Sequence, residues 1–263
     1  MKLSGNKARV FMTKEFTENL RTKKIFALVC VFVFIALLSV LTARFMGEIF
    51  GAMLGAEGTN VPFTIIMPDP VWTDSYAQLY SNLAEMGSII FIVLFMGAIL
   101  REKSSGTIDL MMAKGLSATA FVMAKFGVAA ILTLGALAVA VFVTYVYTLL
   151  LFDYGGQLGN IVFGALPFAV FILMTLALTL MWSAIAKSTA ISAVLGFVSF
   201  TVVRLLDLLP RIGRFMPGRL LAHGVALSSG GDVDYLPIHI AGAVVITIVS
   251  LWVTVYVLRH REG

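Results

Sequence analysis

Long apolar runs alternate with short polar segments along the whole chain. The hydrocarbon core of a bilayer is about 30 Å thick, and a helix needs about 20 apolar residues to cross it. We therefore expect six membrane-spanning helices at Ile25–Phe45, Leu83–Leu100, Phe121–Phe152, Ile161–Ile185, Ala190–Leu209 and Ile238–Leu258. The third run is longer than a bilayer requires, so its first residues are expected to form a turn at the membrane surface.

Composition supports the same class of protein. Hydrophobic residues make up 60% of the chain and charged residues 13%, whereas soluble domains carry about 25% charged residues. The mean hydropathy is +0.99. The sequence therefore predicts an all-α integral membrane protein, with an N-terminal segment over residues 1–24 and one six-span membrane domain over residues 25–263. The single cysteine, Cys30, excludes an intrachain disulfide.

The segment before the first span has the pattern of a helix that lies on the membrane surface. Apolar residues recur every four positions at Met12, Phe16 and Leu20, and charged residues fall on the other faces at Lys14, Glu18 and Arg21. This is typical of an interfacial amphipathic helix. The alternative is a disordered basic tail. A cleavable signal peptide is excluded, because the apolar run that follows is too long and has no small-residue cleavage site.

Basic residues fix the expected orientation, because cytoplasmic loops carry an excess of lysine and arginine. Most of them lie before the first span, between spans two and three, and at the C-terminus. We expect both termini in the cytosol and the protein in the plasma (inner) membrane, with its basic face attracted to anionic lipid. The cluster Arg204–Arg219 is the exception to this rule. A nucleic-acid partner is not needed to explain the net charge of +5.

Two external segments are expected to be structured differently. The segment Gly47–Asn82 mixes polar and apolar residues with prolines, which indicates a solvated loop. The segment after span five is more apolar, and Pro210 could open a short helix that Pro217 and Gly218 end. We expect this second segment to dip into the outer interface or to re-enter the bundle.

The connection between spans two and three is unusually polar for a short turn. It reads Arg101-Glu102-Lys103-Ser104-Ser105-Gly106-Thr107-Ile108-Asp109-Leu110-Met111-Met112. Thr107 or Ser105 could cap a helix that starts near Ile108, with Asp109 favourable in its first turn. The apolar side chains that follow could then contact a soluble partner. The alternative is an ordinary solvated turn.

Catalytic signatures are absent from the sequence. It contains no phosphate-binding loop, no H-E-x-x-H and no G-x-S-x-G motif. The three histidines are far apart in sequence, and no metal-ligand cluster is apparent. Glu85 is expected near the outer start of span two, and Arg204 and Asp207 are expected to pair at the outer end of span five. Without a charged relay near the bilayer centre, ion-coupled transport is disfavoured, so energy for uphill movement would come from a partner.

Several motifs along the chain resemble those of one transporter family. The inner connection contains Glu102-Lys103-x-x-Gly106-Thr107-Ile108-x-Leu110, followed by Ala113, Ser117, Phe121 and Lys125 at four-residue intervals. The N-terminal segment contains Lys14-Glu15-Phe16-x-x-x-Leu20-Arg21. Together with six spans, these motifs resemble the permease subunits of the type-two, exporter-like ABC transporter family. The chain departs from the family at residues 115–118, where proline and Ser-Arg are common, and at Ala124, where glycine is common.

The resemblance implies a membrane-spanning subunit without catalytic residues of its own. Two ABC ATPase subunits would bind ATP and Mg, and a second permease copy or a paralogue would complete the transporter. The inner connection would dock on the ATPase as a coupling helix, through Glu102, Lys103, Gly106, Thr107, Ile108, Asp109, Leu110, Met111 and Ser117. The N-terminal segment would form an elbow helix that contains Lys14, Glu15, Phe16, Leu20 and Arg21. Glu102 is the acid expected to meet a basic partner surface.

The sequence leaves the transported substrate unknown. Export of a lipidic, peptide or drug-like molecule is favoured over import. An alternative is a membrane anchor that transmits ATPase force to an external partner protein through its outer segments. A membrane-embedded enzyme is disfavoured, because no nucleophile, acid–base pair or metal cluster is present.

Overall fold

The structure, a computed structural model, describes residues 2–56, 69–209 and 211–260. Residues 57–68 of the expected outer loop, Asn60 among them, and Pro210 lie outside the described residues. The rest of that segment, Gly47–Asn82, is largely helical rather than a loop, because one helix runs on to Ala56 and another covers Trp72–Asn82. Within the described part of the chain the protein is helical and has no strand. Six of its helices are long and apolar enough to cross a membrane, which confirms the six-span prediction. Their bounds are Lys24–Ala56 (α2), Trp72–Asn82 continued by Ser88–Phe95 (α3 and α4), Ala118–Phe152 (α7), Leu158–Ile185 (α8), Thr189–Asp207 (α9) and Leu236–Arg259 (α11).

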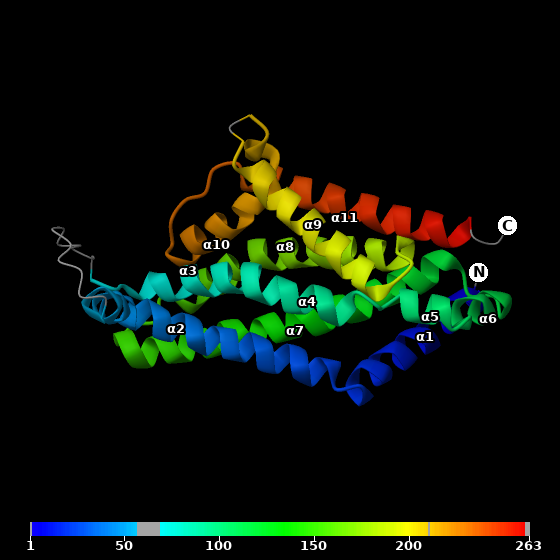
Figure 1. Ribbon diagram of the computed structural model, residues 1–263, viewed down its shortest axis with the longest axis horizontal. Coiled ribbons are helices and arrows are strands. Elements are labelled where there is room, and N and C mark those ends of the chain that lie inside the picture. Colours follow the sequence, from blue (N-terminus) through cyan, green and yellow to red (C-terminus); the bar gives the residue numbers. More distant parts are fainter. Residues whose placement is uncertain (1, 57–68, 210, 261–263) are drawn as a thin grey trace.

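The shorter helices gather at the two ends of this bundle (Figure 1). At one end lie α1 (Lys2–Arg21), α5 (Leu100–Ser104) and α6 (Thr107–Ala113), together with the end of α11. We call this the α6 end. At the other end, α10 (Leu220–Ser228) lies across the bundle near α3, and we call this the α10 end.

The second span begins earlier than the sequence pattern predicts. Its first helix starts at Trp72 rather than at Leu83, and Asp74 stabilises this start by accepting a 2.9 Å hydrogen bond from the backbone N–H of Val71. One face of α3 is buried and carries Ser75, Tyr76, Leu79 and Tyr80, while Thr73, Asp74 and Gln78 are partly exposed. The low hydropathy of α3 concealed this buried face. A π-helical turn at Leu83–Gly87 (η1) joins α3 to α4.

Helix α8 forms the centre of the bundle. It is the most deeply buried of the candidate spans, and its aromatic side chains contact neighbours on both sides. Phe168 stacks on Tyr80 of α3 at 5.5 Å between ring centroids, and Phe171 meets Phe200 of α9 edge-on at 6.0 Å. Such pairs add to the stability that apolar burial already supplies.

Helix α10 packs very closely against α8 through two glycines. A Cβ atom added at Gly164 would fall against the side chain of Ser228 and within 2.6 Å of the Gly224 carbonyl oxygen. Leu220 and Leu221 of α10 are buried, and the 3-10 turn Pro217–Arg219 (η3) leads into this helix. Within the segment after span five, η3 and α10 are therefore packed into the bundle at the α10 end.

This close approach predicts that a glycine-to-alanine substitution within a helix lowers the stability of the protein. Alanine normally stabilises a helix relative to glycine, but Gly164→Ala should destabilise the protein by about 1–3 kcal/mol because the added methyl overpacks the α8–α10 contact. The matched control is Gly159→Ala, in the same helix, where an added Cβ meets nothing within 4 Å. Thermal unfolding of the purified variants in detergent measures the difference. Equal stability of the two variants would contradict the assigned α8–α10 packing.

Candidate functional site

The α6 end carries a compact helical loop between α5 and α7. The chain turns at Gly106, whose φ of +69° lies in the left-handed region, and forms α6 from Thr107 to Ala113. Ser117 then caps α7 by accepting a 3.2 Å hydrogen bond from the Ala120 backbone N–H. The predicted helix near Ile108 with Asp109 in its first turn is confirmed.

The prediction that Thr107 or Ser105 caps this helix is wrong. Gly106 occupies the position before α6 and offers no side chain, while the hydroxyl groups of Ser105 and Thr107 bond to each other at 2.7 Å. The left-handed turn at Gly106 sets the direction of α6 without a side-chain cap.

The two faces of α6 differ in exposure. Ile108 is buried, whereas Leu110 is 57% exposed and Asp109 is also exposed. Met111 and Met112 are half-buried and pack on the core. The apolar surface available to a partner is therefore smaller than expected, and Leu110 with Asp109 dominates it.

Hydrogen bonds tie the loop to the end of α8. The ammonium group of Lys103 donates to the carbonyl oxygens of Ala184 at 2.7 Å and Ala186 at 3.3 Å. The Ser183 hydroxyl oxygen accepts from the backbone N–H groups of Ile99 and Leu100 at 3.0 and 3.2 Å. A lysine is favourable at a helix C-terminus, where carbonyl groups lack partners. These bonds join the loop rigidly to the central helix.

A second set of contacts joins the loop to α1 and α7. Lys125 of α7 binds Glu15 of α1 at 2.9 Å and lies 3.2 Å from the carboxylate of Glu102. Lys14 of α1 binds Glu102 at 3.1 Å and Glu18 at 3.1 Å. We call these five residues the ion cluster. It connects three segments that are distant in sequence.

Most of the ion cluster is shielded from solvent. The side chains of Lys125, Glu15 and Glu102 are 6%, 7% and 12% exposed. The rings of Phe11 and Phe121 stack at 5.2 Å, and the ammonium group of Lys125 lies within 6 Å of both ring centres. Aromatic faces attract cations in this arrangement. Lys125 is therefore held by carboxylates on one side and by rings on the other.

Burial and charge act against each other on the titrating groups of α1. Burial raises the pKa of Glu15, and Lys125 opposes this shift only in part. Burial by itself lowers the pKa of Lys14, but its hydrogen bonds to Glu18 and Glu102 outweigh burial and raise it. Burial likewise raises the pKa of Glu18, whereas the hydrogen bond from Lys14 lowers it, and the net shift is downward.

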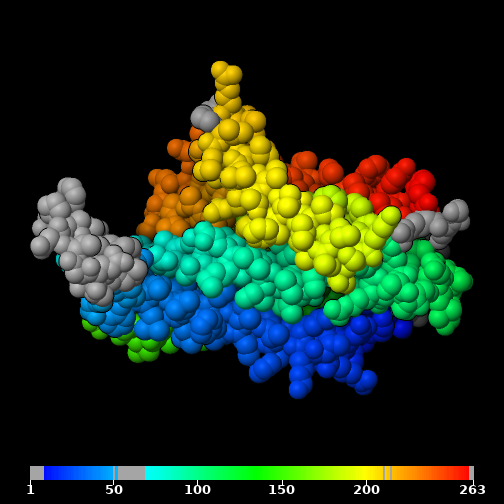
Figure 2. Space-filling model, in the orientation of Figure 1, coloured from blue at the N-terminus to red at the C-terminus, as the bar shows by residue number. Residues whose placement is uncertain are grey.

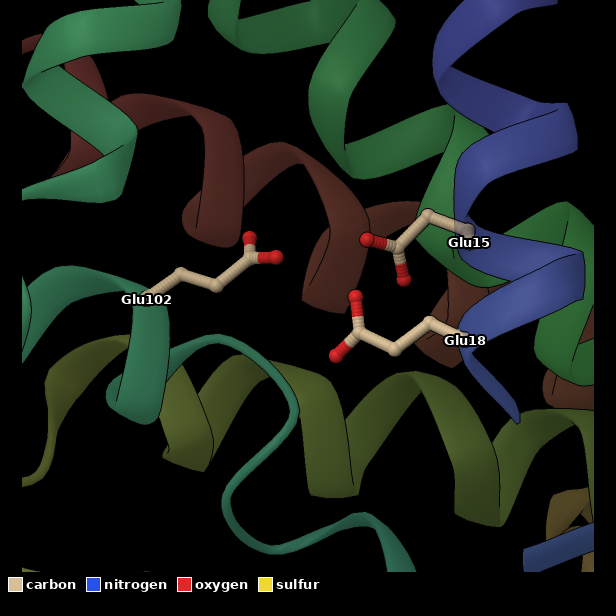
Figure 3. Close-up of side chains that lie close together, drawn as sticks. All are labelled: Glu15, Glu18 and Glu102. Carbon is tan, nitrogen blue, oxygen red and sulfur yellow. The ribbon is translucent and has the colours of Figure 1, made fainter. Parts of the chain in front are cut away.

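The three carboxylates of the cluster point toward one another, as Figure 3 shows for Glu15, Glu18 and Glu102. Each offers an oxygen atom within 4.8 Å of the others, a spacing that a metal ion could use. In this structure the lysines already supply the positive charge, because Lys14 and Lys125 contact all three carboxylates. The geometry is that of a lysine–glutamate network.

The structure divides the expected coupling residues into two groups. Asp109 and Leu110 are exposed. Ile108 is buried, and Lys103 donates a hydrogen bond to the Ala184 carbonyl oxygen at the end of α8. The orientation expected for Glu102 needs correction. Its carboxylate is enclosed with Lys14 and Lys125 because α1 packs across the loop, so it is not presented to a partner surface.

The helix α1, expected as the elbow helix, turns its apolar stripe away from the bundle. Its apolar side chains Phe16 and Leu20 are exposed, by 42% and 51%, and Arg21 is also exposed. Its polar side chains Glu15 and Asn19 are buried against the bundle. An apolar outward face suits contact with lipid.

Sequence reasoning missed the contact between Glu15 and Lys125. A partial signal was present, because Phe121 and Lys125 are four residues apart on one face of α7, as are Phe11 and Glu15 on α1. Where the two faces meet, Phe11 stacks on Phe121 and Glu15 pairs with Lys125. Without knowledge that α1 folds back on α7, these contacts could not be recognised.

The charges at the α10 end also pair differently from the prediction. Asp207 forms its ion pair with Arg219 at 3.8 Å, in place of the expected pair with Arg204. This occurs because η3 folds over the end of α9 and brings Gly218 against the Asp207 side chain. The histidines His223 and His239, treated as separate in the sequence, meet with ring nitrogens 3.0 Å apart. Burial and the nearby His239 lower the pKa of His223.

The ion cluster should dominate the stability of the α6 end. Lys125→Met should cost about 3–5 kcal/mol, because it leaves the buried Glu15 carboxylate without its main partner. The double variant Lys125→Met/Glu15→Gln should recover part of this loss, since it removes the uncompensated charge. Lys187→Met, at an exposed lysine of the same end, serves as the control and should change stability by less than about 0.5 kcal/mol. Denaturation in detergent measures all three, and an equal effect of the single and double variants would argue against the pairing.

Comparison with known families agrees with this architecture. The family described as ABC-2 family transporter protein matches residues 10–209, which include the second half of α1, the ion cluster and the loop around α6. The match ends before α10 and α11. No curated protein matches the chain. Members of this family are generally non-catalytic membrane subunits that work with a partner ATPase. The resemblance seen in the sequence is thereby confirmed, and the chain belongs to the ABC-2 family of transporters, as a permease subunit of an ABC transporter.

Proposed function

We propose that this chain forms the transmembrane pathway of an ATP-driven exporter whose ATPase subunits dock on the loop at residues 101–118. The single observation that supports this most is the attachment of α6. Asp109 and Leu110 are exposed at the end of the bundle, and the loop that carries them is fixed to α8 and to the ion cluster. Such a loop can receive a push from a soluble partner and pass it to the spans.

The proposed coupling runs through rigid contacts. A displacement of α6 would reach α8 through Lys103 and Ser183, and would reach α1 and α7 through Glu102. Packed elements of this kind move as units rather than deform gradually. ATP and Mg would be bound by two ATPase subunits, and a second copy of the permease or a paralogue would complete the pathway.

The proposed orientation places the α6 end in the cytosol of the cell and the protein in its plasma membrane. The exposed apolar stripe of α1, including Phe16 and Leu20, would lie against the lipid of the cytosolic leaflet. The lysines and arginines at this end agree with the positive-inside rule. The cargo that we favour is lipidic, peptide or drug-like, and movement is outward.

One observation favours a second function, that of an anchor which transmits ATPase force to an external protein. Exposed apolar side chains gather at the α10 end, at Leu208, Leu209, Ile212 and Phe215. An external protein could bind there. Transport by the purified permease–ATPase complex in vesicles, without any further protein, would distinguish export from this alternative.

Docking on α6 can be tested by replacing its most exposed apolar residue. Leu110→Asp should abolish the ATP hydrolysis that copurifies with the chain from membranes of its own host, because a charge replaces an apolar contact. The chain purified alone should not hydrolyse ATP. The matched control is Leu208→Asp, which is 76% exposed at the opposite end and should retain hydrolysis. Full activity in the Leu110→Asp complex would refute docking on α6.

The orientation can be tested by cysteine accessibility in a Cys30→Ala background, which removes the only native thiol. Ser104→Cys and Lys187→Cys should be shielded from an impermeant thiol reagent in intact cells. Gln157→Cys and Ser229→Cys, as well as Asn60→Cys, should react with it. Labelling at Ser104→Cys from outside would reverse the orientation and separate α6 from any cytosolic ATPase.

A further inference from the structure

The π-helical turn in the second span carries an acidic side chain on the surface of the bundle. Glu85 lies within η1 (Leu83–Gly87) and is exposed. Along the same face, Ile89 and Val93 follow at four-residue intervals and are 48% and 49% exposed. A single carboxylate thus begins an otherwise apolar stripe. π-helical turns occur frequently at functional sites.

Contacts with α2 fix the depth of Glu85. Asn82, one turn before it, donates a 2.9 Å hydrogen bond to Ser39, and Gly87 lies against Ile35. Glu85 is therefore level with α2 between residues 35 and 39. At 1.5 Å per residue, this level is roughly 16–22 Å from Lys24 and roughly 8–14 Å from Arg44. These two residues bound the uncharged run of α2, so Glu85 lies within the thickness of the hydrocarbon core.

The second span lies at the surface beside α2 and α9 (Figure 2). Among the described residues, the carboxylate of Glu85 has no ion pair or hydrogen bond. An ionised group that faces lipid is costly, and such groups almost always face a polar cavity or a partner. The exposed face of η1 is therefore not a lipid-facing surface in the working protein.

A second copy of the chain places no lysine or arginine at the depth of Glu85. Every lysine and arginine lies near an end of a span, and none occurs within residues 25–43, 72–100, 126–186, 188–203 or 220–258. Any copy that packs against η1 presents the same uncharged spans. In a transporter built from two copies of this chain, a positive charge at this depth would therefore come from another molecule.

We infer that Glu85 binds the positively charged group of an amphipathic organic cation that passes along the exposed face of η1 and α4. Met86, Ile89 and Val93 provide the apolar contact for the rest of that molecule. A bare divalent cation fits poorly, because such ions need six or more oxygen ligands and one carboxylate supplies two. This inference rests on the proposed export function and narrows its cargo to cations.

The first test asks whether water reaches this face. In the Cys30→Ala background, the Glu85→Cys variant in intact membranes should react with a cationic, water-soluble methanethiosulfonate. Tetraphenylphosphonium, used as the probe cation, should protect it. Val245→Cys, 59% exposed on α11 and expected to face lipid, should not react. Absence of reaction at Glu85→Cys would overturn the inference, since the face would then be sealed or in lipid.

The second test measures equilibrium binding of tetraphenylphosphonium to the full chain in lipid nanodiscs, without ATPase. Glu85→Gln should weaken binding by about tenfold or more, because it removes the countercharge, whereas Glu85→Asp should retain it. Glu48→Gln, an exposed acid near the end of α2, is the matched control. Unchanged binding in Glu85→Gln would overturn the inference. Because neither test needs an ATPase, failure here is distinct from failure of docking on α6.

Discussion

The arrangement of the α6 end depends on the burial of Lys125. A lysine ammonium group loses its hydration when it is buried, and this cost is offset only if carboxylates meet it closely. Glu15 and Glu102 supply them, at 2.9 and 3.2 Å, from two different segments. If α1 or the loop moved away separately, charges would be left buried without partners. The three segments are therefore constrained to hold or to change their positions together.

This constraint explains why a short loop can matter to a large membrane domain. The loop is also bonded to the end of α8, the most buried helix, through Lys103 and Ser183. Helix α11 joins the same assembly by packing along α8, and Arg259 near its end donates a hydrogen bond to Thr119 at the start of α7. Forces applied at α6 would thus act directly on α1, α7 and α8, and would reach α11 through its packing on α8. A permease that works with a separate ATPase needs a connection of this kind.

Apolar run length predicted the spans well, because crossing a bilayer demands about 20 apolar residues whatever their neighbours are. The start of α6 was predictable as well, since Gly106 and Asp109 act within a few residues of each other. The ion cluster was not predictable, because the contact of Glu15 with Lys125 depends on how two distant helices pack. For the same reason the partner of Asp207 was wrongly taken to be Arg204, which is near in sequence, rather than Arg219. The early start of α3 was missed because one buried face leaves little trace in average hydropathy.

Charged residues near the ends of the spans and the charged residue within the hydrocarbon depth differ in whether the chain supplies a partner of opposite charge. Lysines and arginines lie outside the middle of the spans, and three of them, Lys14, Lys125 and Arg219, form ion pairs with acids of the ion cluster or with Asp207. Glu85 is the exception, an acid within the hydrocarbon depth for which the chain provides no base. If the carboxylate served only to stabilise the fold, a lysine at the same depth would be expected, as Lys125 serves Glu15. Its unmatched charge is instead what a site needs if the balancing cation has to arrive and leave.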